Sequence, residues 1–161
     1  MADTWIINAS PLILLARIGH LDWLEKMVAN PLVPAKVIEE VLAGQAFDPT
    51  ANVAVKWASH YRVENIEVPM TIQVWKIDPG ESQVIAHALQ QPTSYAILDD
   101  AATRRCALSL GISVFGSIGI VLRAKKSNLI PQARPWLEKL KKAGLFANDH
   151  LLQIALAKVG E

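Results

Sequence analysis

The chain has 161 residues, of which 52% are hydrophobic and 19% are charged, and its formal net charge is +1 at pH 7. This composition excludes an intrinsically disordered protein, and the length predicts a single domain over residues 1–161 with a sizeable hydrophobic core. The single cysteine, Cys106, excludes an internal disulfide and a zinc site built from several thiolates.

The charges are distributed unevenly along the chain. Residues 1–100 carry 6 basic and 12 acidic side chains, whereas residues 101–142 carry 9 basic side chains and 1 acidic side chain. This polarity is typical of a protein that binds a metal with one part and a polyanion with another. Solvated helix faces explain the basic residues equally well, so both interpretations stay open.

No targeting segment or membrane span is expected. Residues 5–16 are apolar, but Asp3 precedes them and no basic segment does. The uncharged stretch 106–122 is short for a membrane span and contains three serines and three glycines. A cytoplasmic location fits these features.

Short apolar runs alternate with amphipathic segments. The runs predict strands over 5–8, 31–33, 60–63, 95–98 and 112–114. The amphipathic segments predict helices over 11–18, 20–29, 34–43, 50–58, 80–90, 100–110, 117–126, 131–142 and 148–159. This alternation favours an α/β fold, a three-layer α/β/α sandwich around a mainly parallel central sheet.

Two polar residues follow the first predicted strand. Asn8 and Ser10 flank Ala9, and Ser10 precedes Pro11, which is typical of a helix N-cap followed by proline at the first helical position. Asn8 either caps the same helix or joins two strands by hydrogen bonds. Ligands of open α/β sheets bind beyond the carboxyl ends of the strands, so Asn8 also marks a candidate binding edge.

Acidic residues accompany the next two helices of interest. Glu39 and Glu40 lie on opposite sides of an apolar stripe, so periodicity does not choose between them and favours solvent for both. Glu81 lies on the apolar stripe of helix 80–90, which directs its carboxylate inward and implies a partner such as a metal ion. A capping box with Asp78 is an equally good explanation of Glu81.

Two aspartates end the fourth predicted strand. Asp99 projects toward the buried side of the following helix, whereas Asp100 is more exposed. Helix capping requires only one of them, which leaves the other unexplained. Arg104 and Arg105, one turn later, can neutralise either acid or hold a phosphate. Together the acids at strand ends and helix starts suggest a divalent-metal site, because Mg²⁺ and Mn²⁺ prefer oxygen ligands.

No competing chemistry is visible: the sequence has no glycine-rich phosphate loop, no G-x-S-x-G motif and no notable cysteine–histidine pair. The chain resembles the PIN superfamily of metal-dependent nucleases, and within it a prokaryotic branch related to VapC-like toxin ribonucleases. The resemblance covers roughly residues 4–160 and is carried by the order and spacing of five stretches: 6–13 (IINASPLI), 33–41 (VPAKVIEEV), 79–86 (PGESQVIA), 98–104 (LDDAATR) and 111–119 (GISVFGSIG).

The resemblance implies three or four acids around one or two Mg²⁺ or Mn²⁺ ions. By position, the family's first-strand aspartate falls on Asn8, which can coordinate a metal through its carbonyl oxygen but carries no charge. The other implied ligands are Glu40, Glu81 and one or both of Asp99 and Asp100, and the family's polar partner of the first acid falls on Ser10. Substrate-binding residues are then predicted to be Ser10, Arg104, Arg105, Arg123 and Lys125.

Three functions follow from the resemblance. The leading hypothesis is a ribonuclease that hydrolyses RNA phosphodiester bonds and acts as the toxin of a toxin–antitoxin pair. Asn8 motivates the main alternative, a catalytically weakened or inactive PIN-fold module that binds RNA or protein. A third hypothesis is a nuclease that acts on DNA. A homodimer and an antitoxin protein partner are also implied by the family, and no membrane association is expected.

Overall fold

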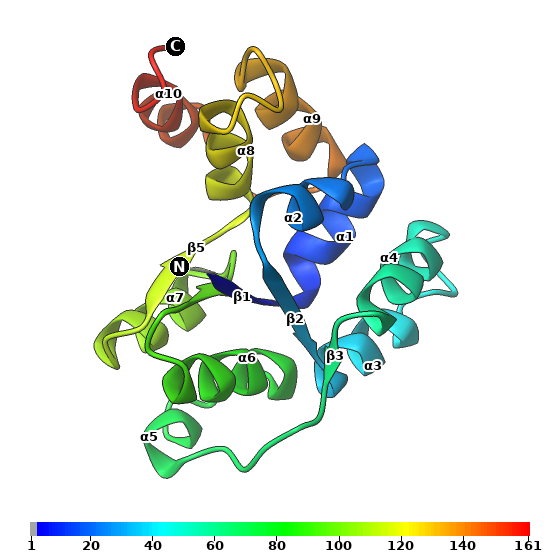
Figure 1. Cartoon of the computed structure of the whole chain (residues 1–161), viewed down its shortest axis with the longest axis vertical. Coiled ribbons are helices and arrows are strands. Elements are labelled where there is room, and N and C mark those ends of the chain that lie inside the picture. The colour runs from blue at the N-terminus through cyan, green and yellow to red at the C-terminus, as the bar shows by residue number, and fades with distance from the viewer. Residues whose placement is uncertain (1–2) are drawn as a thin grey trace.

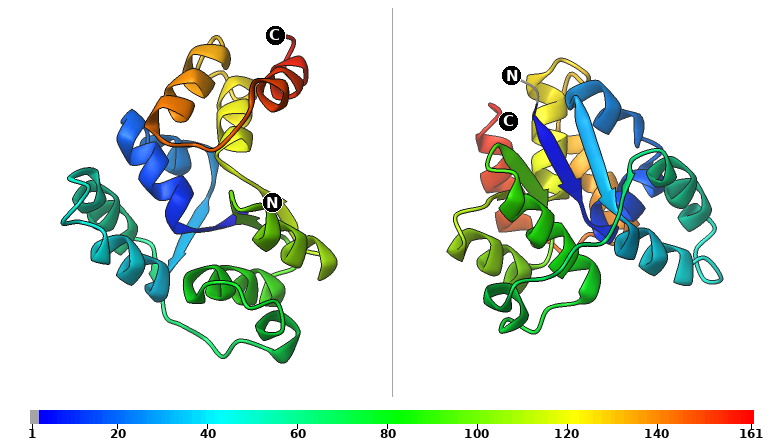
Figure 2. Two further views of the ribbon diagram at one scale, coloured as in Figure 1. Left: turned by 180° about the vertical axis from the view of Figure 1, so that it is seen from behind. Right: turned by 60° about the horizontal axis from the view of Figure 1, so that its bottom comes forward.

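The computed structural model describes residues 3–161 and contains one sheet of five parallel strands in the order β3-β2-β1-β4-β5. Figure 2 shows β1 and β2 side by side and pointing the same way. The predicted parallel sheet is confirmed, with boundaries within two residues of the expected ones. The strands are β1 (Thr4–Ile7), β2 (Asn30–Pro34), β3 (Arg62–Val63), β4 (Ser94–Ile97) and β5 (Ser113–Phe115).

Helices cover both faces of the sheet. Figure 1 shows α1, α2, α8 and α9 on one side and α6 and α7 on the other, which is the predicted sandwich. The helices are α1 (Ala9–Ile18), α2 (Asp22–Met27), α3 (Ala35–Ala43), α4 (Thr50–Ser59), α5 (Met70–Gln73), α6 (Pro79–Gln90), α7 (Ala101–Ser109), α8 (Ser117–Lys126), α9 (Arg134–Ala143) and α10 (Asp149–Ala157). The sequence did not predict α5, because a helix of four residues is too short to show a period.

The core explains why the central strands read as unbroken apolar runs. All four residues of β1 are buried, as expected for a parallel strand covered by helices on both faces. The register pairs Ile7 with Ile97, so the residues that follow β1 and β4 emerge side by side. Within residues 3–161, no helix is long and apolar enough to cross a membrane.

The predicted N-cap at Ser10 is wrong, and the capping box, one of two explanations left open for Glu81, does not form. Helix α1 begins at Ala9, one residue before Ser10, and Asn8 occupies the N-cap position without a side-chain hydrogen bond. The Ser10 hydroxyl instead donates to the Asp99 carboxylate at 2.7 Å. At α6, Asp78 is the N-cap but no side chain closes a capping box, so Glu81 is not explained by capping.

The side chain of Glu161 joins three helices at the end of the chain. Its Oε2 accepts from Lys125 Nζ of α8 at 2.8 Å and from the Ala133 N–H at 2.6 Å. Its Oε1 accepts from the Arg134 N–H at 3.2 Å, so Glu161 supplies the acceptors that α9 lacks at its own N-terminus. The hydrogen bond from Lys125 is the main cause that lowers the pKa of Glu161 to about 2.

Replacing Glu161 with glutamine is expected to lower the free energy of unfolding at pH 7 by about 1 kcal/mol, a figure discounted for solvent screening. Because the folded pKa lies below the unfolded one, this stabilisation is present above pH 4.5 and is lost as the pH falls toward 2. Urea unfolding at pH 7 and pH 3 measures it. Glu138→Gln, an equal charge change on the exposed face of α9, is the control and leaves stability nearly unchanged.

Candidate active site

Polar side chains gather at the carboxyl ends of β1, β4 and β5. Asn8 follows β1, Asp99 and Asp100 follow Leu98 after β4, and Ser117 follows Gly116 after β5. The backbone joins these three ends, because the Asn8 N–H donates to the Ile97 carbonyl at 3.2 Å and the Leu98 N–H donates to the Phe115 carbonyl at 2.9 Å. The predicted binding edge of the sheet is therefore where these residues meet.

Asp99 is the most strongly hydrogen-bonded of the predicted acids. Its Oδ2 accepts from the Ser10 hydroxyl at 2.7 Å and from the Ser117 hydroxyl at 2.8 Å. Its Oδ1 accepts from the Ser117 N–H at 2.7 Å, at the N-terminus of α8. A half-buried carboxylate therefore ties the start of α1 to the start of α8 and is held in one orientation.

Gly116 lets α8 approach that carboxylate. A Cβ atom at this position would lie 2.5 Å from Asp99 Oδ1 and 2.9 Å from the Leu98 carbonyl oxygen, closer than real side chains come. Any larger residue would therefore displace either the carboxylate or the strand. The absence of a Cβ at Gly116, and not a special backbone angle, is what makes room for Asp99.

Asp100 has a different role from its neighbour. It is the N-cap of α7, and its Oδ2 accepts from the Thr103 N–H at 2.9 Å and from the Thr103 hydroxyl at 3.0 Å. These hydrogen bonds lower the pKa of Asp100 below the ordinary value of an aspartate. Asp100 is exposed and Asp99 is half-buried, as the sequence predicted.

Glu40 reaches across from α3 to the start of α6. Its Oε1 accepts from the Gly80 N–H at 2.9 Å, and a Cβ on Gly80 would collide with the Glu40 carboxylate. Glu39 points to solvent, where its side chain is 66% exposed and pairs with Lys36. The tie between the two glutamates is therefore resolved in favour of Glu40, which lies beside α6.

Glu81 lies among like charges. Burial is the main cause that raises the pKa of Glu81 to about 7, and the nearby negative charges of Asp100, Asp78 and Glu40 and a hydrogen bond with the Asp78 side chain act in the same direction. The Oε2 atom of Glu81 is buried and has no hydrogen-bond partner within the described residues. Burying an ionised carboxylate without a nearby positive group costs free energy. An oxygen in this position therefore favours the binding of a cation.

Asn8 presents a second oxygen of this kind. The side chain is 7% exposed, and its Oδ1 has no hydrogen-bond partner within residues 3–161. Buried polar atoms in native proteins are nearly always paired, so an unpaired amide oxygen at the edge of the sheet points to a ligand. The sequence alternatives for Asn8 were a helix cap or a link between strands. The backbone makes the link, and the side chain makes no cap.

The predicted acids do not form a ready-made ligand cluster. In the described part of the chain, no three aspartate, glutamate, histidine or cysteine side chains lie close enough together to hold one metal ion. Three of the acids accept hydrogen bonds from neutral donors instead: Glu40 from Gly80, Asp99 from two serines and Asp100 from Thr103. The two unpaired oxygens, on Asn8 and Glu81, are the hard donors that Mg²⁺ and Mn²⁺ prefer, so the donor chemistry fits these ions.

The predicted basic residues divide into two groups. Arg104 and Arg123 line a groove beside β5, and Arg105 is close enough to Asp100 to help lower its pKa. Lys125 lies elsewhere: its ammonium group donates to Glu161 and to the Val159 carbonyl, each at 2.8 Å. Lys125 therefore stabilises the end of the chain and does not line the groove.

Sequence reasoning did not assign Ser117, Gly80 or Gly116 to the site. Each acts on a predicted acid, since Ser117 binds Asp99 and the two glycines leave room for Asp99 and Glu40. The signal for Ser117 was present, because Gly116-Ser117 ends a short apolar run as Asp99-Asp100 does. Nothing in the sequence indicated that Gly80 faces Glu40, 40 residues earlier.

A family model described as a PIN domain matches residues 4–161. The chain belongs to the PIN-domain family. PIN domains are generally nucleases that use divalent metals, and the parallel sheet with acids at its carboxyl edge is consistent with that class. No curated protein matches the chain.

Proposed function

We propose that this PIN domain is a ribonuclease that depends on Mg²⁺ or Mn²⁺ and hydrolyses RNA phosphodiester bonds. The observation that carries the proposal is the buried, unpartnered oxygen of Glu81 within a group of like-charged acids. Keeping such a carboxylate ionised costs free energy unless a cation is bound beside it. The edge of the sheet where it lies is the usual ligand edge of α/β folds.

The proposed ligands are Asn8, Glu40, Glu81, Asp99 and Asp100, and the acids would have to move closer together around an ion, because no three of them lie within reach of one in the described structure. When bound there, a divalent ion supplies an activated water and stabilises the negative charge of an attack on phosphorus. Glu81 and Asn8 offer oxygens that no protein group uses. Hydrogen bonds from Ser10 and Ser117 hold the Asp99 carboxylate in one orientation, so that its position does not depend on substrate.

Asn8 supports the alternative function. An amide in place of a carboxylate removes one negative charge from the site, which lowers its affinity for a divalent cation. Three acids bonded to neutral donors also fit a PIN-fold module that binds RNA or protein without cleaving it. Replacing Asn8 with aspartate separates the two functions: a large gain in Mn²⁺ affinity and cleavage supports a weakened nuclease, and no metal binding by either form supports the binding module.

The partners and setting remain part of the proposal. A role as the toxin of a toxin–antitoxin pair, a homodimeric state, a cytoplasmic location and the preference for RNA over DNA all come from the family resemblance. Competition between RNA and DNA oligonucleotides of the same sequence tests the substrate preference directly.

The wild-type protein is expected to cleave structured RNA in the presence of Mn²⁺. Glu81→Ala and Glu40→Ala are each expected to reduce the cleavage rate by roughly two orders of magnitude, the size found for losing one electrostatic contributor. Glu39→Ala, which removes the exposed neighbour of Glu40, is the matched control and leaves the rate unchanged. Activity that survives Glu81→Ala unchanged would remove this mechanism.

A further inference from the structure

A groove with a volume of about 350 Å³ lies between α8 and α10, beside β5. Its apolar lining includes Leu151 and Ile154, which are each 45% exposed. Four basic side chains line it and no acidic side chain does. They are Arg104, Arg123, Lys126 and Lys158.

The four positive charges are not paired directly with carboxylates in the described part of the chain, although the negative charge of Asp3 is near enough to Arg123 to act on its pKa. Within residues 3–161, none of these side chains forms an ion pair with a carboxylate. The guanidinium of Arg123 lies 3.6 Å from the centre of the Phe115 ring and donates to the Gly119 carbonyl at 3.4 Å, which restricts its movement. The groove therefore offers unpaired, partly ordered positive charge to an anion.

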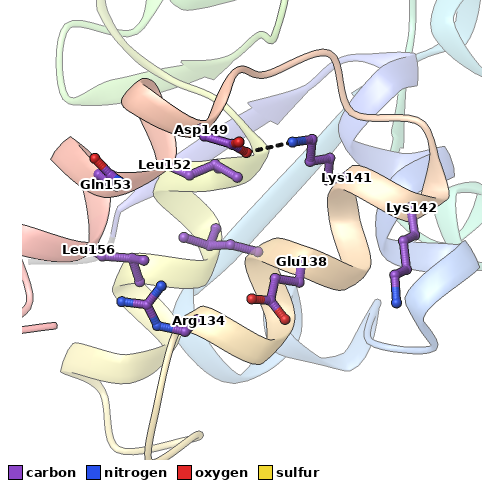
Figure 3. A pocket seen from close by; sticks show the side chains of 9 residues that line it. Arg134, Glu138, Lys141, Lys142, Asp149, Leu152, Gln153 and Leu156 are labelled. Carbon is purple, nitrogen blue, oxygen red and sulfur yellow. Dashed lines mark hydrogen bonds and ion pairs between the residues drawn. The ribbon is translucent and has the colours of Figure 1, made fainter.

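A second groove shows that this pattern is not general on the surface. Figure 3 shows the groove between α9 and α10, where basic and acidic side chains alternate. Lys141 forms an ion pair with Asp149 at 2.7 Å, and Glu138 lies on the same wall as Lys142. That groove is of mixed sign, whereas the groove between α8 and α10 has one sign only.

The positive groove is continuous with the candidate active site. Gly116 lines the groove, and a Cβ placed on it would lie 2.5 Å from Asp99 Oδ1 and 3.4 Å from Arg104 Nη1. Arg104 therefore stands where the groove meets the acids. A chain that is bound along the groove is led to the carboxyl edge of the sheet.

We propose that this groove binds the phosphodiester backbone of a single-stranded RNA and leads it to the acids of the active site. This inference rests on the proposed function, which it extends by naming the path of the substrate. Positive charge without paired carboxylates fits a polyanion, and the apolar lining fits unpaired bases, which a duplex would hide. An acidic peptide would also be attracted by these charges, but it is not a substrate of a site that hydrolyses phosphodiester bonds.

The test measures RNA binding in EDTA, so that cleavage does not contribute. The variant Lys126→Gln/Lys158→Gln removes two exposed charges of the groove, and Lys56→Gln/Lys142→Gln removes two exposed charges elsewhere. Fluorescence anisotropy with a labelled single-stranded RNA oligonucleotide gives the Kd across a range of salt concentrations. The groove variant is expected to bind about tenfold more weakly at low salt, with a salt slope reduced by about 1.4, and the control is expected to match wild type.

Several outcomes would overturn the inference: no RNA binding by the wild type, equal losses in the two double variants, or displacement of the RNA by poly-glutamate as effective as by unlabelled RNA. The result is separate from the test of the proposed function. Groove-dependent binding without cleavage in Mn²⁺ would keep the groove and remove the ribonuclease. Cleavage in Mn²⁺ together with equal RNA binding by the two double variants would keep the ribonuclease and remove the groove.

Discussion

Replacing Asp99 with alanine is expected to lower the free energy of unfolding by about 2–4 kcal/mol. The carboxylate accepts hydrogen bonds from the Ser10 hydroxyl and from both the hydroxyl and the N–H of Ser117. Its loss leaves these donors unpaired in a half-buried place, and each unpaired donor costs about 1–3 kcal/mol before solvent relaxation. Urea unfolding at pH 7 measures the change.

The neighbouring aspartate provides the matched control. Asp100→Ala removes the N-cap of α7 and is expected to cost only about 1 kcal/mol, because Asp100 is exposed and bonds only to Thr103. Asp99→Asn keeps an acceptor for the Ser117 N–H and is expected to fall between the two. Equal losses for Asp99→Ala and Asp100→Ala would show that Asp99 does not link α1 to α8 in solution.

Replacing Glu81 with glutamine is expected to stabilise the metal-free protein at pH 8 by about 1–2 kcal/mol, a value discounted because the group is half exposed. The folded pKa of Glu81 is about 7, above its ordinary value of 4.5. The folded state therefore holds the proton more tightly than the unfolded state. The contribution of Glu81 to stability is therefore fully present below pH 4.5 and is lost as the pH rises through 7, and replacement by glutamine removes that loss.

Thermal unfolding in EDTA at pH 4.5 and pH 8 measures this effect. The two proteins are expected to have similar stability at pH 4.5 and to separate at pH 8. Adding Mn²⁺ at pH 8 is expected to raise the Tm of the wild type and to raise that of Glu81→Gln much less, because a ligand stabilises only the form that binds it. Glu39→Gln is the control for the loss of one carboxylate. A pH-independent difference would show that Glu81 is not held among like charges.

The two serines that bind Asp99 illustrate how far sequence reasoning reached. Ser10 was correctly placed at the edge of the sheet, but local spacing suggested a helix cap, because Ser-Pro is common at helix starts. The tertiary structure brings the Asp99 carboxylate, 89 residues away in the sequence, to the Ser10 hydroxyl, and the charge of this acceptor strengthens the hydrogen bond. A long-range partner of this kind leaves no local pattern in the sequence.

The positive groove illustrates the same limit for charge. The sequence shows an excess of basic residues over 101–142, which allowed two interpretations, a surface that binds a polyanion or solvated helix faces. In the folded protein, Arg104 and Arg123 line one groove together with Lys158, which directly follows α10. Lys125 instead forms an ion pair with Glu161. Which basic residues stay unpaired depends on the packing of α8 against α10.

The sequence by itself determined the succession of strands and helices along the chain, apart from α5. It also placed Asn8, Glu81 and Asp99 at the ends of these elements, because hydrophobic periodicity and turn chemistry are local. Only the tertiary structure decided what those residues meet. In the folded protein, Asp99 accepts hydrogen bonds from two serines, whereas one oxygen each of Glu81 and Asn8 has no hydrogen-bond partner within residues 3–161. The physical reason is that hydrogen bonds and repulsion between side chains depend on distances across the sheet, which local patterns do not record.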